Sequence, residues 1–275
     1  MKNLKILTIA VLTPLVIGFT SCDKDDDTMA AGKGTFNISM TDAPADYSSL
    51  DVNIESVTAF NSNTNEWVEL NGKAQAVQVL ELTNGEKTTI ANNSNVEAGL
   101  YTKLKIKFTD QNQVGVTSNS TSTSNSTATE SKFNLTFDNA NDKEVIIDIT
   151  QEVSANQEAR ILVDFNAAKS VKESNNGNDK VYTFKPEITV LANSETEIAG
   201  HIEGGENVVV YIENGTDVRS TYPDENGDYK FIGVFEGDYT LKIAGSNANE
   251  EEEIMYEENN INVSAETTAT INIIL

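Results

Sequence analysis

The residue types that most often carry catalysis are scarce in this chain. It has one histidine, His201, one cysteine, Cys22, and no Gly-x-Ser-x-Gly segment. A serine or cysteine nucleophile needs a base beside it, usually histidine, and a zinc site needs several His or Cys ligands. His201 lies in a strand-like segment, which favours an ordinary exposed or edge position. The sequence therefore predicts no catalytic residue, no zinc centre, no cofactor and no enzyme activity.

Carboxylates, by contrast, are abundant, with 43 Asp and Glu residues against 19 Lys and Arg. Asp224, Asn226 and Asp228 have the alternate spacing of a calcium-binding loop, but no glutamate stands at the twelfth position. The preceding Tyr222-Pro223 and the strand pattern that follows favour a hairpin turn, with calcium as the minor alternative. A glycoside hydrolase with two carboxylates also stays open, because its signature is a separation in space.

Aromatic side chains are the other candidates, because several rings on one exposed face could stack on sugars. Trp67 and Tyr101 stand beside apolar neighbours, so we expect both in a core. Tyr222 lies next to the predicted turn and is the best candidate for an exposed ring. Tyr211, Tyr229 and Tyr239 are further candidates for such stacking.

The formal net charge of −24 excludes one class of partner. Such a charge repels the phosphates of nucleic acids, so we expect no nucleic-acid binding. The chain has only two arginines, Arg160 and Arg219, and therefore no arginine cluster for phosphate or sulfate groups.

The N-terminal residues have the order of a secretory signal peptide, predicted to span residues 1–21. Lys2 and Lys5 precede an apolar run from Ile6 to Phe19, and Cys22 follows. The run is shorter than the roughly 20 residues that a membrane-spanning helix needs. No later segment is apolar over such a length.

The segment Phe19-Thr20-Ser21-Cys22 resembles a bacterial lipobox. The resemblance implies that Cys22 receives a diacylglyceryl group, that the chain is cut before it, and that the freed amine is acylated. Two or three acyl chains anchor a protein durably, whereas one binds only marginally. A free thiol is the alternative. We expect the chain to reach its membrane through this lipid anchor.

The residues after Cys22 carry a second resemblance. Lys24, Asp25 and Asp26 resemble the lipoprotein export signal of Bacteroidetes, which implies a place on the outward face of the outer membrane. The alternative is a solvated acidic tether over residues 22–33. Asp27-Thr28-Met29 resembles the short O-glycosylation motif of that phylum, with Thr28 as the acceptor.

Beyond the tether, apolar and polar residues alternate with a period of two, as in residues 36–40 and 104–108. This period is typical of antiparallel sheets with one buried face, so the sequence predicts an all-β fold. The pattern breaks near 192–197 and restarts, which predicts two tandem β-sandwich domains, 34–192 and 197–275. We expect the Ser/Thr/Asn-rich tract 117–131 to be a mobile loop and Glu250–Glu253 to be a solvated loop.

Several segments of the first predicted domain occur in a characteristic order. They are Gly34–Pro44, Val52–Ile54, Trp67–Leu70, Leu80–Gly85, Ala98–Tyr101, Val163–Phe165, Ser170-Val171 and Lys185–Ile188. Together they resemble the bacterial family called domain of unknown function 4382, most specifically at Thr41–Pro44 and Lys185-Pro186. The family has no established activity, so the resemblance implies a fold and a secreted context but no chemistry.

In the second predicted domain, Asp224–Phe231 and Phe235–Leu241 resemble carboxypeptidase-regulatory-like (transthyretin-like) β-sandwiches. Asn226-Gly227 predicts a tight turn within the first of these segments. The resemblance implies a noncatalytic spacer or contact module.

These features together predict a noncatalytic surface lipoprotein that binds or presents a glycan or an envelope protein. The alternative is a pilin-like or envelope-assembly subunit, because Bacteroidetes fimbrial subunits are lipoprotein precursors with two transthyretin-like domains. Many of those are matured by an arginine-specific protease, yet no arginine precedes Arg160. A hydrolase with paired carboxylates is the third hypothesis.

Overall fold

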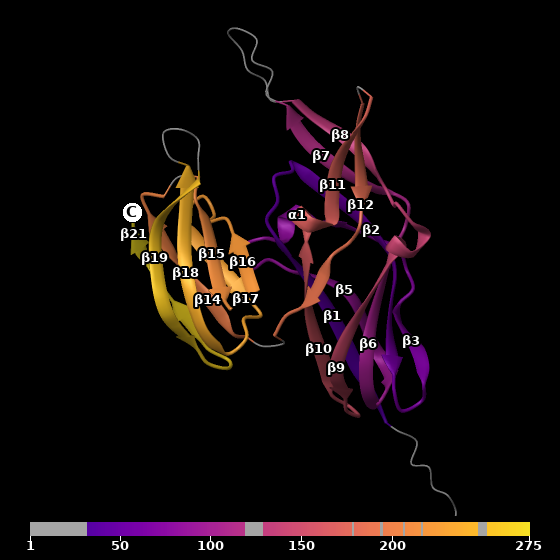
Figure 1. Ribbon diagram of the computed structural model, residues 1–275. Coiled ribbons are helices and arrows are strands. Elements are labelled where there is room, and N and C mark those ends of the chain that lie inside the picture. Colours follow the sequence, from indigo (N-terminus) through magenta and orange to yellow (C-terminus); the bar gives the residue numbers. More distant parts are fainter. Residues whose placement is uncertain are drawn as a thin grey trace, which may run out of the picture. The chain divides into compact units, whose positions relative to one another are not determined.

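The structure, a computed structural model, describes residues 32–118, 129–177, 179–192, 195–205, 207–215, 217–246 and 252–275. Nearly all regular structure in these ranges is β-strand, which confirms the all-β prediction (Figure 1). Gly32–Leu275 forms one compact unit. In the described ranges, no helix has the length and apolar character needed to cross a membrane.

Several predictions concern residues outside these ranges. They are the lipid anchor at Cys22, the export signal at Lys24, Asp25 and Asp26, and the glycosylation acceptor Thr28. These stay predictions from the sequence.

The elements of the first part of the chain are β1 (Lys33–Ala43), β2 (Ser49–Asn61), β3 (Glu66–Asn71), β4 (Gln75–Gln78), η1 (Val79–Leu82), β5 (Thr88–Glu97), β6 (Gly99–Phe108), β7 (Asn112–Ser118), β8 (Thr129–Thr136), η2 (Ala140–Lys143), β9 (Glu144–Val153), β10 (Glu158–Asn166), α1 (Ala167–Ser170), β11 (Val171–Asn176), β12 (Asp179–Phe184) and β13 (Ile188–Val190). Those of the second part are β14 (Glu197–Glu203), β15 (Val209–Asn214), β16 (Asp217–Thr221), β17 (Asp228–Ile232), β18 (Gly237–Ser246), β19 (Glu252–Val263), β20 (Thr268–Thr270) and β21 (Ile273–Ile274).

The first core lies between two sheets. One has the strand order β13-β10-β1-β5, and the other runs β11-β12-β8-β7-β2-β6-β9 with β3 and β4 also paired to β2. The alternating residues of β1 and β6 behave as predicted, because Phe36, Ile38, Leu104 and Ile106 are fully buried. One feature departs from the antiparallel expectation. The pairs β1·β10 and β8·β12 are parallel.

The second core has a separate set of buried residues from Ile198 to Ile273. Its two sheets have the orders β17-β14-β20, with β21 also on β14, and β16-β15-β18-β19. Tyr229 and Phe231 of β17 are both buried, as their spacing predicts.

Two predicted loops are partly wrong. β19 begins at Glu252, so Glu252 and Glu253 belong to an exposed edge strand, where charge discourages pairing with another chain. In the Ser/Thr/Asn-rich tract, β7 continues to Ser118 and β8 begins at Thr129. Residues 119–128 lie outside the described ranges.

A polar and apolar junction joins the two cores. Leu162, Leu191 and Ile232 form a small buried cluster of their own. Asn84, which precedes Gly85, has φ +55°. Its Nδ2 donates to the Asp228 carbonyl at 3.0 Å, and its Oδ1 accepts from the Lys230 N–H at 2.7 Å. Asn84 thus ties the first core to the strand that follows the 222–227 turn.

The same junction contains buried charge. Asp42 and Asp164 are 6% and 7% exposed. Burial raises the pKa of Asp42 to about 9, with the Asp164 charge adding to the effect. Burial also raises the pKa of Asp164 to about 6, against the favourable charge of Arg219. Asp42 is therefore protonated at neutral pH, and Arg219 compensates the charge of Asp164.

Candidate functional site

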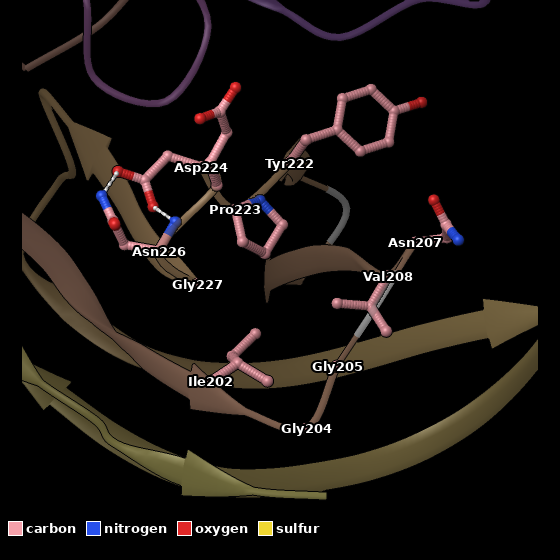
Figure 2. Close-up of a pocket in the computed structure, with 11 residues that line it drawn as sticks. Ile202, Gly204, Gly205, Asn207, Val208, Tyr222, Pro223, Asp224, Asn226 and Gly227 are labelled. Atoms are coloured by element: carbon pink, nitrogen blue, oxygen red, sulfur yellow. Dashed lines mark hydrogen bonds between the residues drawn. The ribbon is translucent and has the colours of Figure 1, made fainter.

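A hollow of about 610 Å³ opens on the second core, between the end of β14 and the turn that follows β16. Ile202 and Val208 supply its apolar floor, and each is 3% exposed. Figure 2 shows the Pro223 ring above these two side chains, with Tyr222 and Asn207 toward one end. The hollow combines a buried apolar floor with a ring and polar groups at its rim.

The turn that forms one wall is fixed by its own side chain. Asp224 Oδ1 accepts hydrogen bonds from the backbone N–H groups of Asn226 at 2.8 Å and Asp228 at 2.9 Å (Figure 2 shows the first). These N–H donors hold the pKa of Asp224 below its usual value. Gly227 has φ +88°, and a Cβ there would lie 2.4 Å from the Ile202 carbonyl oxygen. The Asn-Gly turn is therefore where the sequence predicts it, and it requires glycine.

This geometry fits a turn better than the calcium alternative. Asp224 directs one oxygen at backbone donors, and Asp228 Oδ1 lies 2.8 Å from His201 Nδ1. The described ranges contain no group of three or more His, Cys, Asp or Glu side chains that could hold a metal ion. The His201 side chain is 47% exposed, in the kind of position that its strand pattern predicts.

Tyr222 is 40% exposed, which confirms the prediction of an exposed ring. Partial burial raises the pKa of its hydroxyl, and the charge of Asp46, which accepts its hydrogen bond, raises it further. The same ring lines a smaller hollow of about 180 Å³ with Pro44 and Tyr47. The Tyr222 ring therefore borders both hollows.

The prediction that Trp67 is buried is wrong. Trp67 is 39% exposed, whereas Tyr101 is fully buried as predicted. The Trp67 ring packs edge-on against Phe60 at 5.4 Å between centroids, and Lys105 Nζ lies 4.4 Å from its ring centre. The period of two was the signal that would have placed it, because Leu70 faces the core and Trp67 is three positions away.

Tyr211 is partly exposed, and its hydroxyl donates to Glu252 Oε1 at 3.4 Å. Two further tyrosines of the second core do not add to the exposed aromatic surface. Tyr229 and Tyr239 are 2% and 4% exposed. Each hydroxyl donates to a backbone carbonyl, that of Ile271 for Tyr229 and that of Phe235 for Tyr239. Both are core residues whose hydroxyl groups are hydrogen-bonded.

The described lining of the hollow has few groups that could act in catalysis. None of the described residues that line it is lysine, arginine, serine or histidine. Its rim offers the Glu225 carboxylate, the Asn207 and Asn226 amides and the Tyr222 ring. An apolar floor with a few convergent polar groups is typical of small-molecule sites.

Comparison with known proteins gives a family. Residues 33–186 match the family described as Domain of unknown function (DUF4382). The match covers more than half of the chain and includes most of the segments singled out in the sequence. No curated protein matches the chain.

Solved structures give only distant likenesses. The Bacillus anthracis TIE protein has 12% identity and a TM-score of 0.23, over 87% of this chain and 40% of that one. The chain thus spans less than half the length of that protein. Shaft pilin spaA from Lactobacillus rhamnosus GG has 8% identity and a TM-score of 0.22, over 88% and 97%. BcpA, the major pilin subunit of Bacillus cereus, has 9% and 0.21, over 88% and 98%. Likeness at this level carries no argument about function.

Proposed function

The chain belongs to the family Domain of unknown function (DUF4382), and from that premise we propose that it is a noncatalytic binding module for carbohydrate. The ligand site is the hollow beside Tyr222. The exposed Tyr222 ring on the lining of a polar-rimmed hollow is the observation that carries the proposal.

Carbohydrates present apolar C–H faces and a ring of hydroxyl groups. The Tyr222 ring offers a flat apolar face, and the Asn207 and Asn226 amides and the Glu225 carboxylate offer donors and acceptors. The volume of about 610 Å³ falls in the range of pockets for small organic ligands. Among the described lining residues, none is a serine, cysteine, lysine or histidine, which supports recognition as the proposed role.

The sequence supplies the setting for this binding. We propose that acylated Cys22 anchors the chain in the outer membrane and that Lys24, Asp25 and Asp26 direct it to the cell surface. In the same proposal the second core is a carboxypeptidase-regulatory-like β-sandwich that presents the hollow. A surface lipoprotein so built would hold glycans near the cell.

A glycan array probed with a chain that begins at Gly32 tests the proposal. Tyr222→Ala is compared with Trp67→Ala, a matched control because the two rings are 40% and 39% exposed. We expect Tyr222→Ala to weaken binding about tenfold through the lost stacking face, and Trp67→Ala to leave it unchanged. Saturable binding by no glycan, or equal loss in both variants, would contradict the proposal.

A further inference from the structure

A second hollow, of about 290 Å³, lies on the first core. The inward residues of β1, Phe36 and Ile38, are fully buried, so Asn37 and Ser39 lie on the outward face of its sheet. The lining residues are Asn37, Ser39, Lys87, Thr89, Glu158, Arg160, Ile161, Leu162 and Ala192. Most of them come from β1, β5 and β10, which are adjacent in the sheet (Figure 1). Lys87 directly precedes β5, and Ala192 follows β13.

Strand pairing brings the polar side chains together. In the parallel pair β1·β10, Asn37 is opposite Arg160. In the antiparallel pair β1·β5, Ser39 is opposite Thr89. These four side chains therefore stand in two neighbouring rows on one face, with their donor groups directed away from the core.

Glu158 organises one side of the hollow. Its Oε1 accepts from Asn37 Nδ2 at 3.2 Å, and its Oε2 accepts from an Arg160 NH2 group. The guanidinium has five N–H donors, and this contact uses one end of the fork. Glu158 thus fixes the direction of Arg160 while leaving other donors available.

Charge in this hollow differs from charge elsewhere in the chain. Lys87 forms no ion pair within the described ranges, and it stands with Arg160 against a single lining carboxylate, Glu158. Glu195 lies near enough to Arg160 to add slightly to its raised pKa, after Glu158. The lining therefore holds one excess positive charge, in a protein with a net charge of −24.

We propose that this hollow binds a sugar that carries one carboxylate, a uronic acid. The carboxylate lies on Lys87 and Arg160, where a planar anion accepts parallel N–H bonds from the guanidinium fork. Sugar hydroxyls bind the Ser39 and Thr89 hydroxyls, and the apolar ring face contacts Leu162. One excess positive charge suits a monoanion better than a phosphate dianion. This site is independent of the hollow beside Tyr222.

The two arginines of the chain make the test specific. Arg160 lines the hollow, whereas Arg219 lies in the junction and donates to the Ile232 carbonyl at 3.0 Å. Titration with glucuronate, followed by the side-chain Nε–H signals in a ¹⁵N-labelled chain, should move the Arg160 signal saturably and leave the Arg219 signal in place. The signal that is missing from the Arg160→Gln variant is that of Arg160. Glucose, sodium chloride at matched ionic strength, and sodium sulfate are the comparison titrants.

Variants separate the site from the general field of the protein. Lys87→Gln should weaken glucuronate binding about fivefold, because one of two cations is lost. Lys172→Gln, the same change at an exposed lysine outside the hollow, should leave it unchanged. An Arg160 signal that stays in place, or moves equally with sulfate or chloride, would overturn the proposal. So would equal weakening by the two lysine variants.

Discussion

The two hollows have opposite chemistry although they belong to one acidic chain. The hollow on the second core has the Glu225 carboxylate and the Tyr222 ring at its rim, and no lysine or arginine among its described lining residues. The hollow on the first core has Lys87 and Arg160 against one carboxylate. A formal charge of −24 describes the long-range field, which salt screens over about 10 Å. The register of neighbouring strands, by contrast, decides which charges meet within a few ångströms.

The junction of the two cores differs from both hollows, because its acidic residues are buried. Both hollows keep their charges in contact with solvent, whereas Asp42 and Asp164 are buried where the two cores meet. Exposed charges chiefly set which ligand binds, and buried charges chiefly set stability. Substitutions at the three places should therefore affect different measurements.

The largest expected effect is on the junction. Arg219→Ala removes the cation that compensates buried Asp164 and should lower the free energy of unfolding by about 3 kcal/mol at pH 8. Lys132→Ala, which breaks an exposed pair with Asp51, should lower it far less. Urea denaturation measures both. Equal losses would show that burial at the junction does not distinguish its charges from those of the surface.

The next effect is a dependence of stability on pH. The raised pKa values mean that the folded state holds protons on Asp42 and Asp164 that the unfolded state has released. The contribution of these two groups to stability is full below about pH 4 and is lost as pH rises, up to about pH 6 for Asp164 and about pH 9 for Asp42. Between pH 6 and 8, the proton that Asp42 holds in the folded state should lower the free energy of unfolding by about 1.4 kcal/mol for each unit of rising pH.

Asp42→Asn tests this assignment. The amide has nearly the same shape and does not titrate, so the slope between pH 6 and 8 should largely disappear. The reference protein and the Asp42→Asn variant should both carry His201→Gln, which removes the single histidine of the chain from the comparison. A slope that survives Asp42→Asn would assign the pH dependence to other groups.

The strands could be predicted because each carries its own signal. Alternation in residues 36–40 and 104–108 is local, and the buried sets match it. Trp67 was misplaced because its apolar neighbours outweighed its position in the alternation. The turn at Asn226-Gly227 and the exposure of Tyr222 also follow from local residues.

The cationic hollow could not be predicted in the same way. Asn37 and Glu158 are 121 positions apart, and they meet because β1 and β10 pair in parallel. Nothing in either strand specifies that partner or its direction. The burial of Asp42 has the same origin. Asp42 lies near the end of β1, and its burial depends on the distant segments that pack against this strand end. Long-range pairing therefore determines the chemistry of both places.

The smallest expected effect concerns the ligand preference of the Tyr222 hollow. Glu225→Gln removes one of the two lining carboxylates, the other being Asp224, that make the Tyr222 hollow unfavourable for anions. Because Glu225 is exposed, the affinity for a neutral glycan should change by less than about threefold. The affinity of that hollow for the acidic counterpart of the same glycan should rise, because a like charge is gone. The measurement is a competition titration of the two glycans, made in an Arg160→Gln background to silence the other hollow. If the preference does not change, the Glu225 carboxylate takes no part in selecting ligands at that site.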